Sequence, residues 1–252
     1  MRKVFTKTFS LFGLIWVICI NTAMTQSVKV AVAANLQPVM RTIKTDFKSS
    51  TGVNIDIISG PSGNLAAQIR NGAPFDVFLS ADTDFPLSLQ HDGFGLTPVK
   101  IYAQGVLIIC SKQRLDLSKW QQLVLTAGIK KIAIANPAIA PYGRATKQAL
   151  NQMNMYDKLK TKLVFGESIS QVNTYVITGT VQAGFTTLSL IKDASNKTPL
   201  YYSVISPKSY TPIEQGMLLL KHARGNASAE KFYRYILSSS ARKIFKQFGY
   251  HI

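Results

Sequence analysis

Residues that support catalysis, redox chemistry and metal binding are scarce in this chain. Its 252 residues include two cysteines and three histidines. Cys19 lies in the apolar N-terminal segment and Cys110 in the apolar run 106–110, so the two form no Cys-x-x-Cys pair. We therefore expect no direct metal ligands, no disulfide and no resident cofactor, and we interpret Cys110 as a buried small hydrophobic residue.

The three histidines also lie outside the loops that we interpret below as a binding site. His91 is at a predicted helix end, His222 at a predicted strand end and His251 near the last residue of the sequence. A hydrolase needs a nucleophile paired with a base, and no histidine is near those loops in the predicted arrangement. We therefore predict that the protein is not an enzyme.

Long apolar runs are limited to the N-terminus. Arg2, Lys3 and Lys7 precede the apolar run 11–20, which is followed by the small-residue segment 21–23. This is the layout of a cleavable signal peptide, and the run is shorter than the roughly 20 residues of a membrane-spanning helix. We predict a signal peptide over about residues 1–26, and hence export to the periplasm.

Acidic residues are scarce as well: 12 stand against 29 Lys and Arg, which gives a formal net charge of +17. The basic residues are scattered, as at Lys158, Lys160 and Lys162, on what we predict to be polar helix faces. The charge therefore has three interpretations: a solvated surface, steering of an anionic solute, or binding of an anionic surface polymer. Because we expect export, we predict no nucleic-acid partner.

The rest of the sequence alternates between strand and helix patterns. A first cycle consists of strands 28–33, 53–58 and 75–79, with helices from about Leu36 and Leu65. A second cycle consists of strands 106–110, 131–135, 163–165 and 181–186, with helices near 120–125, 143–153 and from Ile169. Such alternation predicts parallel sheets.

Two such cycles without a flexible linker predict an α/β fold of two lobes, each a mostly parallel sheet flanked by helices. The chain returns through an apolar segment at 215–220 and ends with helical patterns at 229–237 and 241–248. We predict that lobe 1 consists of residues 27–104 plus 209–252, and that lobe 2 consists of residues 105–208. The site should then lie between the lobes, at the carboxyl ends of the strands.

Four strand-to-helix loops predict the chemistry of that site. Asn35 and Ser62 begin helices in the first cycle, and Tyr142 and Ile169 do so in the second. Each helix N-terminus offers unpaired N–H groups and a partial positive charge, which suit an anion, although each could also be a structural cap only. The side chains are neutral, and only Arg144 is basic nearby, so we predict recognition by hydrogen bonds.

Other residues of these loops have structural interpretations. Gly60 and Gly63 would let the backbone approach a ligand closely. Asp76 and Asp82 flank the third strand, and we interpret them as capping or lobe-packing residues rather than catalytic carboxylates.

These segments carry a resemblance to a known family. The chain resembles the periplasmic molybdate-binding proteins, the soluble receptors of molybdate ABC importers, over nearly all of its length after the signal. The segments that carry the resemblance are 33–36 (AANL), 60–65 (GPSGNL), 72–82 (GAPFDVFLSAD), 135–137 (ANP), 140–143 (APYG) and 166–171 (GESISQ). The resemblance implies a two-lobe periplasmic binding protein of the type II-like class.

The resemblance also implies which residues hold the oxyanion. The family's ligand positions correspond here to Asn35, Ser62, Tyr142 and the backbone N–H of Ile169. Ala34 stands where some relatives have a hydroxyl residue, and Thr187 stands where others have a ligating tyrosine. We include both as weaker candidates.

The resemblance finally implies a mechanism and partners. The lobes would close around molybdate or tungstate and then dock on a membrane permease, and we expect a monomer. Rival interpretations are the same fold binding sulfate, thiosulfate, phosphate or ferric iron, and a basic exported protein that binds a surface polymer. Ferric iron would need tyrosine and carboxylate ligands together, whereas the loops offer only Tyr142 and Glu167.

Overall fold

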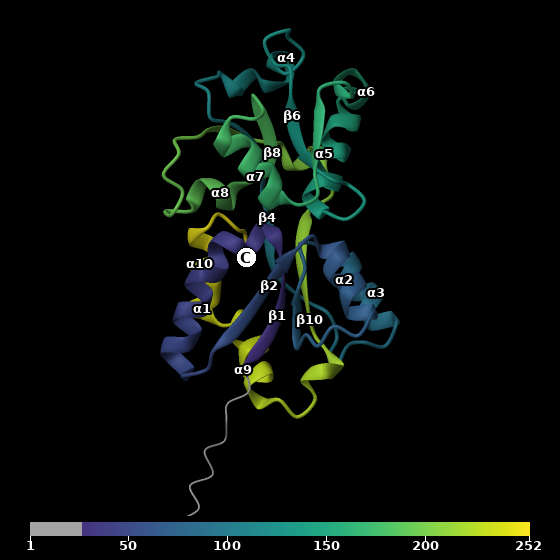
Figure 1. The fold of residues 1–252 in the computed structure, drawn as a ribbon, viewed down its shortest axis with the longest axis vertical. Coiled ribbons are helices and arrows are strands. Elements are labelled where there is room, and N and C mark those ends of the chain that lie inside the picture. The colour runs from purple at the N-terminus through teal and green to yellow at the C-terminus, as the bar shows by residue number, and fades with distance from the viewer. Residues whose placement is uncertain (1–26) are drawn as a thin grey trace, which may run out of the picture.

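The computed structural model describes residues 27–252 and contains two five-stranded sheets. The predicted signal peptide lies outside the described residues. Figure 1 shows the sheets one above the other, with helices on both sides of each and the chain crossing between them twice. We call the lower sheet with its helices lobe 1 and the upper sheet with its helices lobe 2.

Lobe 1 is built on a sheet of mixed direction. Its strands, in spatial order, are β2 (Ile55–Gly60), β1 (Val28–Ala33), β3 (Val77–Leu79), β10 (Ile213–Leu219) and β4 (Lys100–Gly105). β1 is parallel to β2 and β3, whereas β10 is antiparallel to both of its neighbours. Four strands therefore run in one direction and β10 runs against them.

Lobe 2 repeats this order. Its strands are β7 (Leu163–Gly166), β6 (Ile132–Ala135), β8 (Ala183–Thr187), β5 (Leu107–Ser111) and β9 (Tyr201–Val204). β6 is parallel to β7 and β8, and β5 is antiparallel to β8 and β9. Each lobe is thus a mostly parallel sheet with one reversed strand, and the predicted fold class is confirmed.

Helices cover both faces of the lobe 1 sheet (Figure 1). They are α1 (Gln37–Thr51), α2 (Ser62–Arg70), α3 (Asp84–His91), α9 (Ala227–Ile236) and α10 (Ser239–Gln247). α1 ends at Gly52, whose φ of 72° is the left-handed conformation that glycine adopts without strain. The C-terminal helices α9 and α10 pack on lobe 1 against α1, β1, β10 and β4, as the sequence predicts.

The helices of lobe 2 include three short ones, α4 (Trp120–Leu123), α6 (Tyr156–Leu159) and α8 (Leu188–Lys192). Its longer helices are α5 (Pro141–Gln152) and α7 (Ile169–Thr178). α5 and α7 pack on the sheet through apolar residues such as Ala149, Val172 and Val176, which are fully buried. Cys110 is also fully buried, on β5, which agrees with its interpretation as a hydrophobic residue.

Some boundaries differ from the sequence prediction. The third strand begins at Val77 rather than Phe75, because the Phe75 N–H turns back to the Ala73 carbonyl at 2.8 Å. The edge strands β4 and β9 were not predicted. β9 has three exposed residues out of four, so it lacks the apolar pattern of a buried strand.

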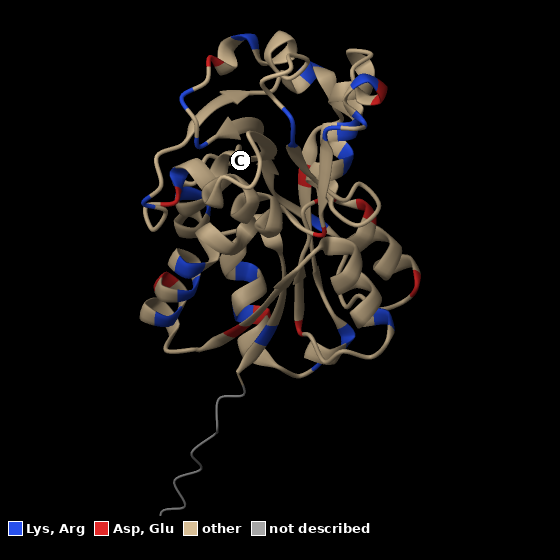
Figure 2. Ribbon diagram, turned by 45° about the horizontal axis from the view of Figure 1, so that its top comes forward, with Lys and Arg blue, Asp and Glu red and all other residues tan. Residues whose placement is uncertain are grey.

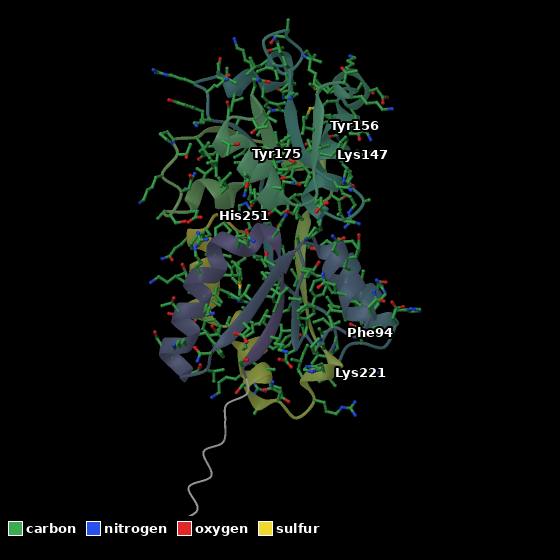
Figure 3. The ribbon with its side chains drawn as sticks, viewed as in Figure 1. Phe94, Lys147, Tyr156, Tyr175, Lys221 and His251 are labelled. Atoms are coloured by element: carbon green, nitrogen blue, oxygen red, sulfur yellow. The ribbon has the colours of Figure 1, made fainter. Side chains whose placement is uncertain are left out.

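The chain crosses between the lobes at residues 105–107 and 205–212. The proposed lobe boundaries at 104/105 and 208/209 fall near or within these crossings and stay a prediction. His251 lies at the junction (Figure 3) and forms an antiparallel bridge with Gln104, at the end of β4. The last residues of the described chain thus lie against the first crossing.

Charged residues are spread along the ribbon of both lobes rather than gathered at one place (Figure 2). Lys and Arg lie mainly on helices and turns at the outside of the ribbon, which favours the solvated-surface interpretation. Within residues 27–252, none of the helices has both the length and the apolar character needed to cross a bilayer.

Candidate functional site

The four predicted loops converge on one cavity between the lobes. The cavity is lined from lobe 1 by Ala33, Ala34, Asn35, Pro61, Ser62 and Ala81, and from lobe 2 by Ala140, Pro141, Tyr142, Ser168 and Ile169. The cavity is small. The volume open to the centre of a water-sized sphere is about 10 Å³, which is room for about one water molecule. All four main candidates and Ala34 are therefore brought together.

Asn35 lies in a short 3-10 turn, η1 (Ala34–Leu36), between β1 and α1 and is 2% exposed. Its Nδ2 donates to Gln215 Oε1 at 3.0 Å and to the Tyr250 hydroxyl at 3.2 Å. Its Oδ1 has no hydrogen-bond partner among the described residues. Contact between this amide and an anion therefore requires one N–H to leave its present acceptor.

Ser62 is the first residue of α2 and is 1% exposed. Its Oγ accepts a hydrogen bond from the Ala81 N–H at 3.1 Å. The hydroxyl proton is not used in that contact and is available to an acceptor in the cavity. Its neighbour Gly63 has a different role from the predicted one: its N–H donates to the Ile139 carbonyl of lobe 2 at 3.0 Å.

The Gly63 contact belongs to the interface between the lobes rather than to a ligand. A Cβ at this position would lie 3.1 Å from Ile139 Cα and 3.0 Å from Phe85 Cζ. Glycine here lets the two lobes approach closely above the cavity.

Tyr142 lies in the first turn of α5, after Pro141, and is 1% exposed. Its hydroxyl accepts hydrogen bonds from Thr187 Oγ1 at 3.2 Å and from Gln215 Nε2 at 3.4 Å. Both contacts use the phenolic oxygen, so the proton is available to a third group. Burial raises the pKa of Tyr142 well above its ordinary value, which keeps it a neutral donor at physiological pH.

Ile169 begins α7, and its side chain is buried. As the first residue of the helix, its N–H has no carbonyl partner within α7. The preceding Ser168 caps the helix, since its Oγ accepts from the Gln171 N–H at 3.3 Å. Ser168 was not among the candidates, although it also lines the cavity.

Thr187, a weaker candidate, does not line the cavity. It caps α8 by accepting from the Ser189 N–H, and it donates to the Tyr142 hydroxyl. Its side chain thus supports Tyr142 from behind. The residues of this buried network that were not found from the sequence include Gln215, Tyr250, Tyr102 and Ser189.

The donors that line the cavity are electrically neutral. Among residues 27–252, those that line it include no charged side chain. A larger hollow of about 210 Å³ lies beside it and is lined in part by Asp82, Asp84, Glu214 and Arg144. Its three carboxylates make it unsuitable for an anion, whereas the small neutral cavity offers N–H and O–H donors at helix N-termini.

Ion pairs hold the lobes together on two sides of the cavity. Arg144 of α5 contacts Asp82 of lobe 1 and lies 3.2 Å from Asp84. Asp82 also accepts from the Phe85 N–H at 3.3 Å in the first turn of α3. It therefore has both the capping and the lobe-packing roles expected of it.

The second pair joins Arg41 of α1 to Asp193, which follows α8, at 2.6 Å. Asp76, by contrast, stays within lobe 1, where it accepts from the Lys29 N–H at 2.8 Å and lies 3.0 Å from His222 Nδ1. The conformation is one in which the lobes are closed on the cavity.

Residues 27–252 contain no group of three or more His, Cys, Asp or Glu side chains placed to hold a metal ion. Cys110 forms no disulfide there, and burial raises the pKa of its thiol to about 12.

Comparisons with known proteins place this geometry in a family. Residues 28–251 match the family described as bacterial extracellular solute-binding protein. The molybdate-binding protein ModA of Azotobacter vinelandii is 33% identical over 229 residues, covering 90% of this chain and 91% of that protein. ModA of Rhodobacter capsulatus is 32% identical over 221 residues, covering 87% and 86%.

A solved structure supports the same grouping. The periplasmic molybdate-binding protein of Azotobacter vinelandii aligns with a TM-score of 0.85 at 33% identity, covering 90% of this chain and 99% of that one. The resemblance carried by the sequence motifs is thereby confirmed, and the chain belongs to the bacterial extracellular solute-binding protein family.

Proposed function

We propose that this protein captures molybdate or tungstate between its lobes. The observation that carries the proposal is the convergence of four helix-start loops, with neutral donors and no lining charge, on one small cavity between the lobes. The similar ModA proteins are named as molybdate-binding. Fixed neutral donors suit a fully ionised oxyanion, since a protonated oxygen would bring a hydrogen that finds no acceptor.

The proposed ligand set has two donors from each lobe. From lobe 1, the Ser62 hydroxyl donates directly, and the Asn35 amide donates once one of its N–H groups is released. From lobe 2, the Tyr142 hydroxyl and the Ile169 N–H complete the set, with Thr187 behind Tyr142. Ala34 forms part of the cavity wall and is the first residue of the η1 turn.

Selectivity over sulfate would come from size. Sulfate has the same charge and shape as molybdate but is smaller, so in a rigid cavity its oxygens reach fewer donors at once. Each lost hydrogen bond to a charged group costs about 1.5 to 3 kcal/mol. Two lost contacts would therefore weaken binding by roughly a hundredfold or more.

We further propose that the loaded, closed form delivers the ion to the membrane permease of an ABC importer, and that the protein works in the periplasm as a monomer without catalysis. A binding protein of this kind needs a difference between its open and closed states that a partner can recognise. The ion pairs Arg144–Asp82 and Arg41–Asp193 join the lobes only when these are close, and they provide such a difference.

The test is a thermal melt of residues 27–252 with molybdate, tungstate, sulfate, phosphate or buffer at fixed ionic strength. Ligand at 1,000 times its dissociation constant adds about 4 kcal/mol, which for this size is on the order of 10 °C. We expect that rise with molybdate and tungstate but not with sulfate.

Other outcomes would redirect the proposal. A rise with sulfate or phosphate alone would keep the anion site and reject the ion. No rise with any oxyanion, together with binding of anionic polymers that falls steeply with salt, would reject the receptor function in favour of the polymer-binding alternative. Salt-insensitive binding of molybdate is the expected result.

A further inference from the structure

Gln215 is a fully buried polar residue at the junction of the lobes, and it does not line the cavity. It lies on β10, the reversed strand of lobe 1, which runs up to the junction in Figure 1. The pairing of β10 with β4 shifts register between Gln215 and Gly216. At this shift Gln215 lies opposite Ala103 and Gly216 opposite Ile101, so Tyr102 of β4 is the residue without a partner on β10.

The carboxamide of Gln215 connects one candidate ligand residue of each lobe. Its Oε1 accepts from Asn35 Nδ2 of lobe 1 at 3.0 Å. The Tyr102 hydroxyl lies 3.1 Å from the same oxygen, but its single proton has the Ser80 carbonyl as a nearer acceptor at 2.8 Å. Nε2 of Gln215 donates to the Tyr142 hydroxyl of lobe 2 at 3.4 Å. Since Asn35 holds the oxygen, the NH2 group is left facing Tyr142.

That orientation decides what the Tyr142 hydroxyl can do. An amide NH2 only donates, so Tyr142 must be an acceptor toward Gln215. Thr187 Oγ1 contacts the same oxygen from lobe 2. Because the phenolic oxygen already accepts two hydrogen bonds, the hydroxyl proton points in a third direction. Tyr142 lines the cavity, so this third direction can lead into it.

Gly105, in the first crossing, is what makes the contact sterically possible. A Cβ at this position would lie 2.0 Å from the Tyr142 hydroxyl oxygen and 2.8 Å from Gln215 Nε2. The hydrogen bond therefore passes beside the crossing itself, between a strand of lobe 1 and a helix of lobe 2.

We propose that Gln215 is a positioning residue for the oxyanion: by donating to the Tyr142 hydroxyl it turns the phenolic proton into the cavity, and it does so only when lobe 2 is closed on lobe 1. The inference rests on the proposed function and names a determinant of affinity in that same site. Gln215 acts through Tyr142 and touches no ligand itself.

The informative variant is Gln215→Glu, which keeps the shape and the acceptor for Asn35 and Tyr102. Its second oxygen, when ionised, accepts the Tyr142 proton and withdraws it from the cavity. We expect molybdate affinity, measured by calorimetry, to fall by about tenfold or more. Gln215→Met, which removes the donor without recruiting the proton, should bind with intermediate affinity.

A double-mutant cycle with Tyr142→Phe separates positioning from charge repulsion. If Gln215 acts through Tyr142, the loss caused by Gln215→Glu becomes much smaller in the Tyr142→Phe background. An unchanged loss in that background would overturn the inference, as would wild-type affinity in Gln215→Glu. Gln182→Met is the matched control, because the Gln182 carboxamide binds the Lys130 and Lys131 N–H groups away from the cavity.

A ligand-free readout keeps the inference separate from the proposed function. The Cζ chemical shift of Tyr142, from NMR of the labelled protein, reports its hydroxyl hydrogen bonds and is assigned with Tyr142→Phe. It should move in Gln215→Glu and stay in Gln182→Met. Wild type that binds no molybdate would reject the function, whereas an unmoved Tyr142 signal would reject the role of Gln215.

Discussion

The two lobes have the same strand order but support the site in different ways. In each sheet the first two parallel strands lead into cavity-lining loops: β1 and β2 in lobe 1, β6 and β7 in lobe 2. Repeating one topology thus produces four helix starts at one place. In lobe 1, Asn35 is held by Tyr250 and Gln215 of the same lobe. In lobe 2, Tyr142 depends on Gln215 across the junction.

The difference teaches that topology and polar packing have separate roles. Strand order decides where donors can lie, because parallel strands end at a common edge. The buried hydrogen bonds decide which donors are oriented before the lobes meet. By this comparison the Asn35 amide of lobe 1 is held within its own lobe and must release one N–H to bind an anion, whereas the hydroxyl of lobe 2 is oriented by closure.

The largest expected effect comes from adding a side chain at Gly105, where the two lobes meet. In Gly105→Ala the added methyl overlaps the Tyr142 hydroxyl and Gln215 Nε2. Overpacking of this kind costs about 1 to 3 kcal/mol or more, and here it also displaces a ligand donor. We expect a clear fall in melting temperature and at least a hundredfold loss of molybdate affinity by calorimetry.

Gly128→Ala is the matched control for that variant. Gly128 is exposed, and an added Cβ would meet only Thr126 Oγ1 at 3.8 Å. It should bind and melt like wild type. If Gly105→Ala bound molybdate with wild-type affinity, the Tyr142 side chain would have more freedom to move than the comparison of the two lobes assumes.

Removing one hydroxyl from each lobe compares them directly. Ser62→Ala and Tyr142→Phe each delete a hydrogen bond to an anion, which is worth about 1.5 to 3 kcal/mol. Each should therefore weaken molybdate binding by about 10- to 100-fold in a titration. Ser62→Ala should also lower the melting temperature of the ligand-free protein, because it leaves the Ala81 N–H without its acceptor. If either variant bound normally, the hydroxyl that it lacks would not be a donor to the anion.

Sequence reasoning predicted four loop residues that the structure brings to one cavity, because these positions follow local rules. Asn35, Ser62, Tyr142 and Ile169 each stand where an apolar strand pattern gives way to a helical one, so their common edge could be predicted. Gln215 could not, because its partners are distant in sequence and nothing local marks a strand glutamine as a network centre. Thr187 shows the same limit: its side chain lies behind Tyr142 rather than in the cavity.

The fold, like the site, could be predicted from the sequence where local patterns decide the structure. Continuous apolar runs such as β5 and β6 are buried at every position and were found. β4 and β9 have exposed residues and pair as edge strands, so their pattern is set by tertiary neighbours rather than by periodicity.

A smaller effect is expected at the two ion pairs between the lobes. Arg144→Met leaves Asp82, whose side chain is 13% exposed, without its partner, and should weaken molybdate binding by about tenfold. Arg41 is 58% exposed in its pair with Asp193, so Arg41→Met should cost less than about fivefold. Equal losses in titrations of the two variants would contradict this ranking.

The Arg144 variant also has an expected pH dependence. Burial raises the pKa of Asp82 above its ordinary value, while Arg144 opposes that rise. Without Arg144 the folded-state pKa rises further, so protonation favours the folded state as pH falls through it. The melting temperature of Arg144→Met should therefore approach that of wild type as the pH falls from neutral. A gap that widens instead would reject this account of Asp82.

The mildest test changes no residue and uses Cys110 as a natural probe inside lobe 2. Cys110 is fully buried, and its thiol has a raised pKa of about 12, so a thiol reagent at pH 8 reacts only after lobe 2 opens. If opening lobe 2 destroys the site, molybdate at 100 times its dissociation constant should slow labelling by about a hundredfold. Labelling that molybdate does not slow would mean that lobe 2 opens independently of the site.

The arrangement of the two sheets along the chain has a consequence for the order of folding. The strands of lobe 2 come from one continuous stretch, β5 to β9, whereas the sheet of lobe 1 is complete only when β10 inserts between β3 and β4. Contacts between distant segments carry a larger loop-closure cost and form more slowly. Lobe 2 should therefore reach its native contacts first in refolding, and the proposed anion site, whose hydrogen-bond network includes Gln215 of β10, should be among the last parts of the molecule to form.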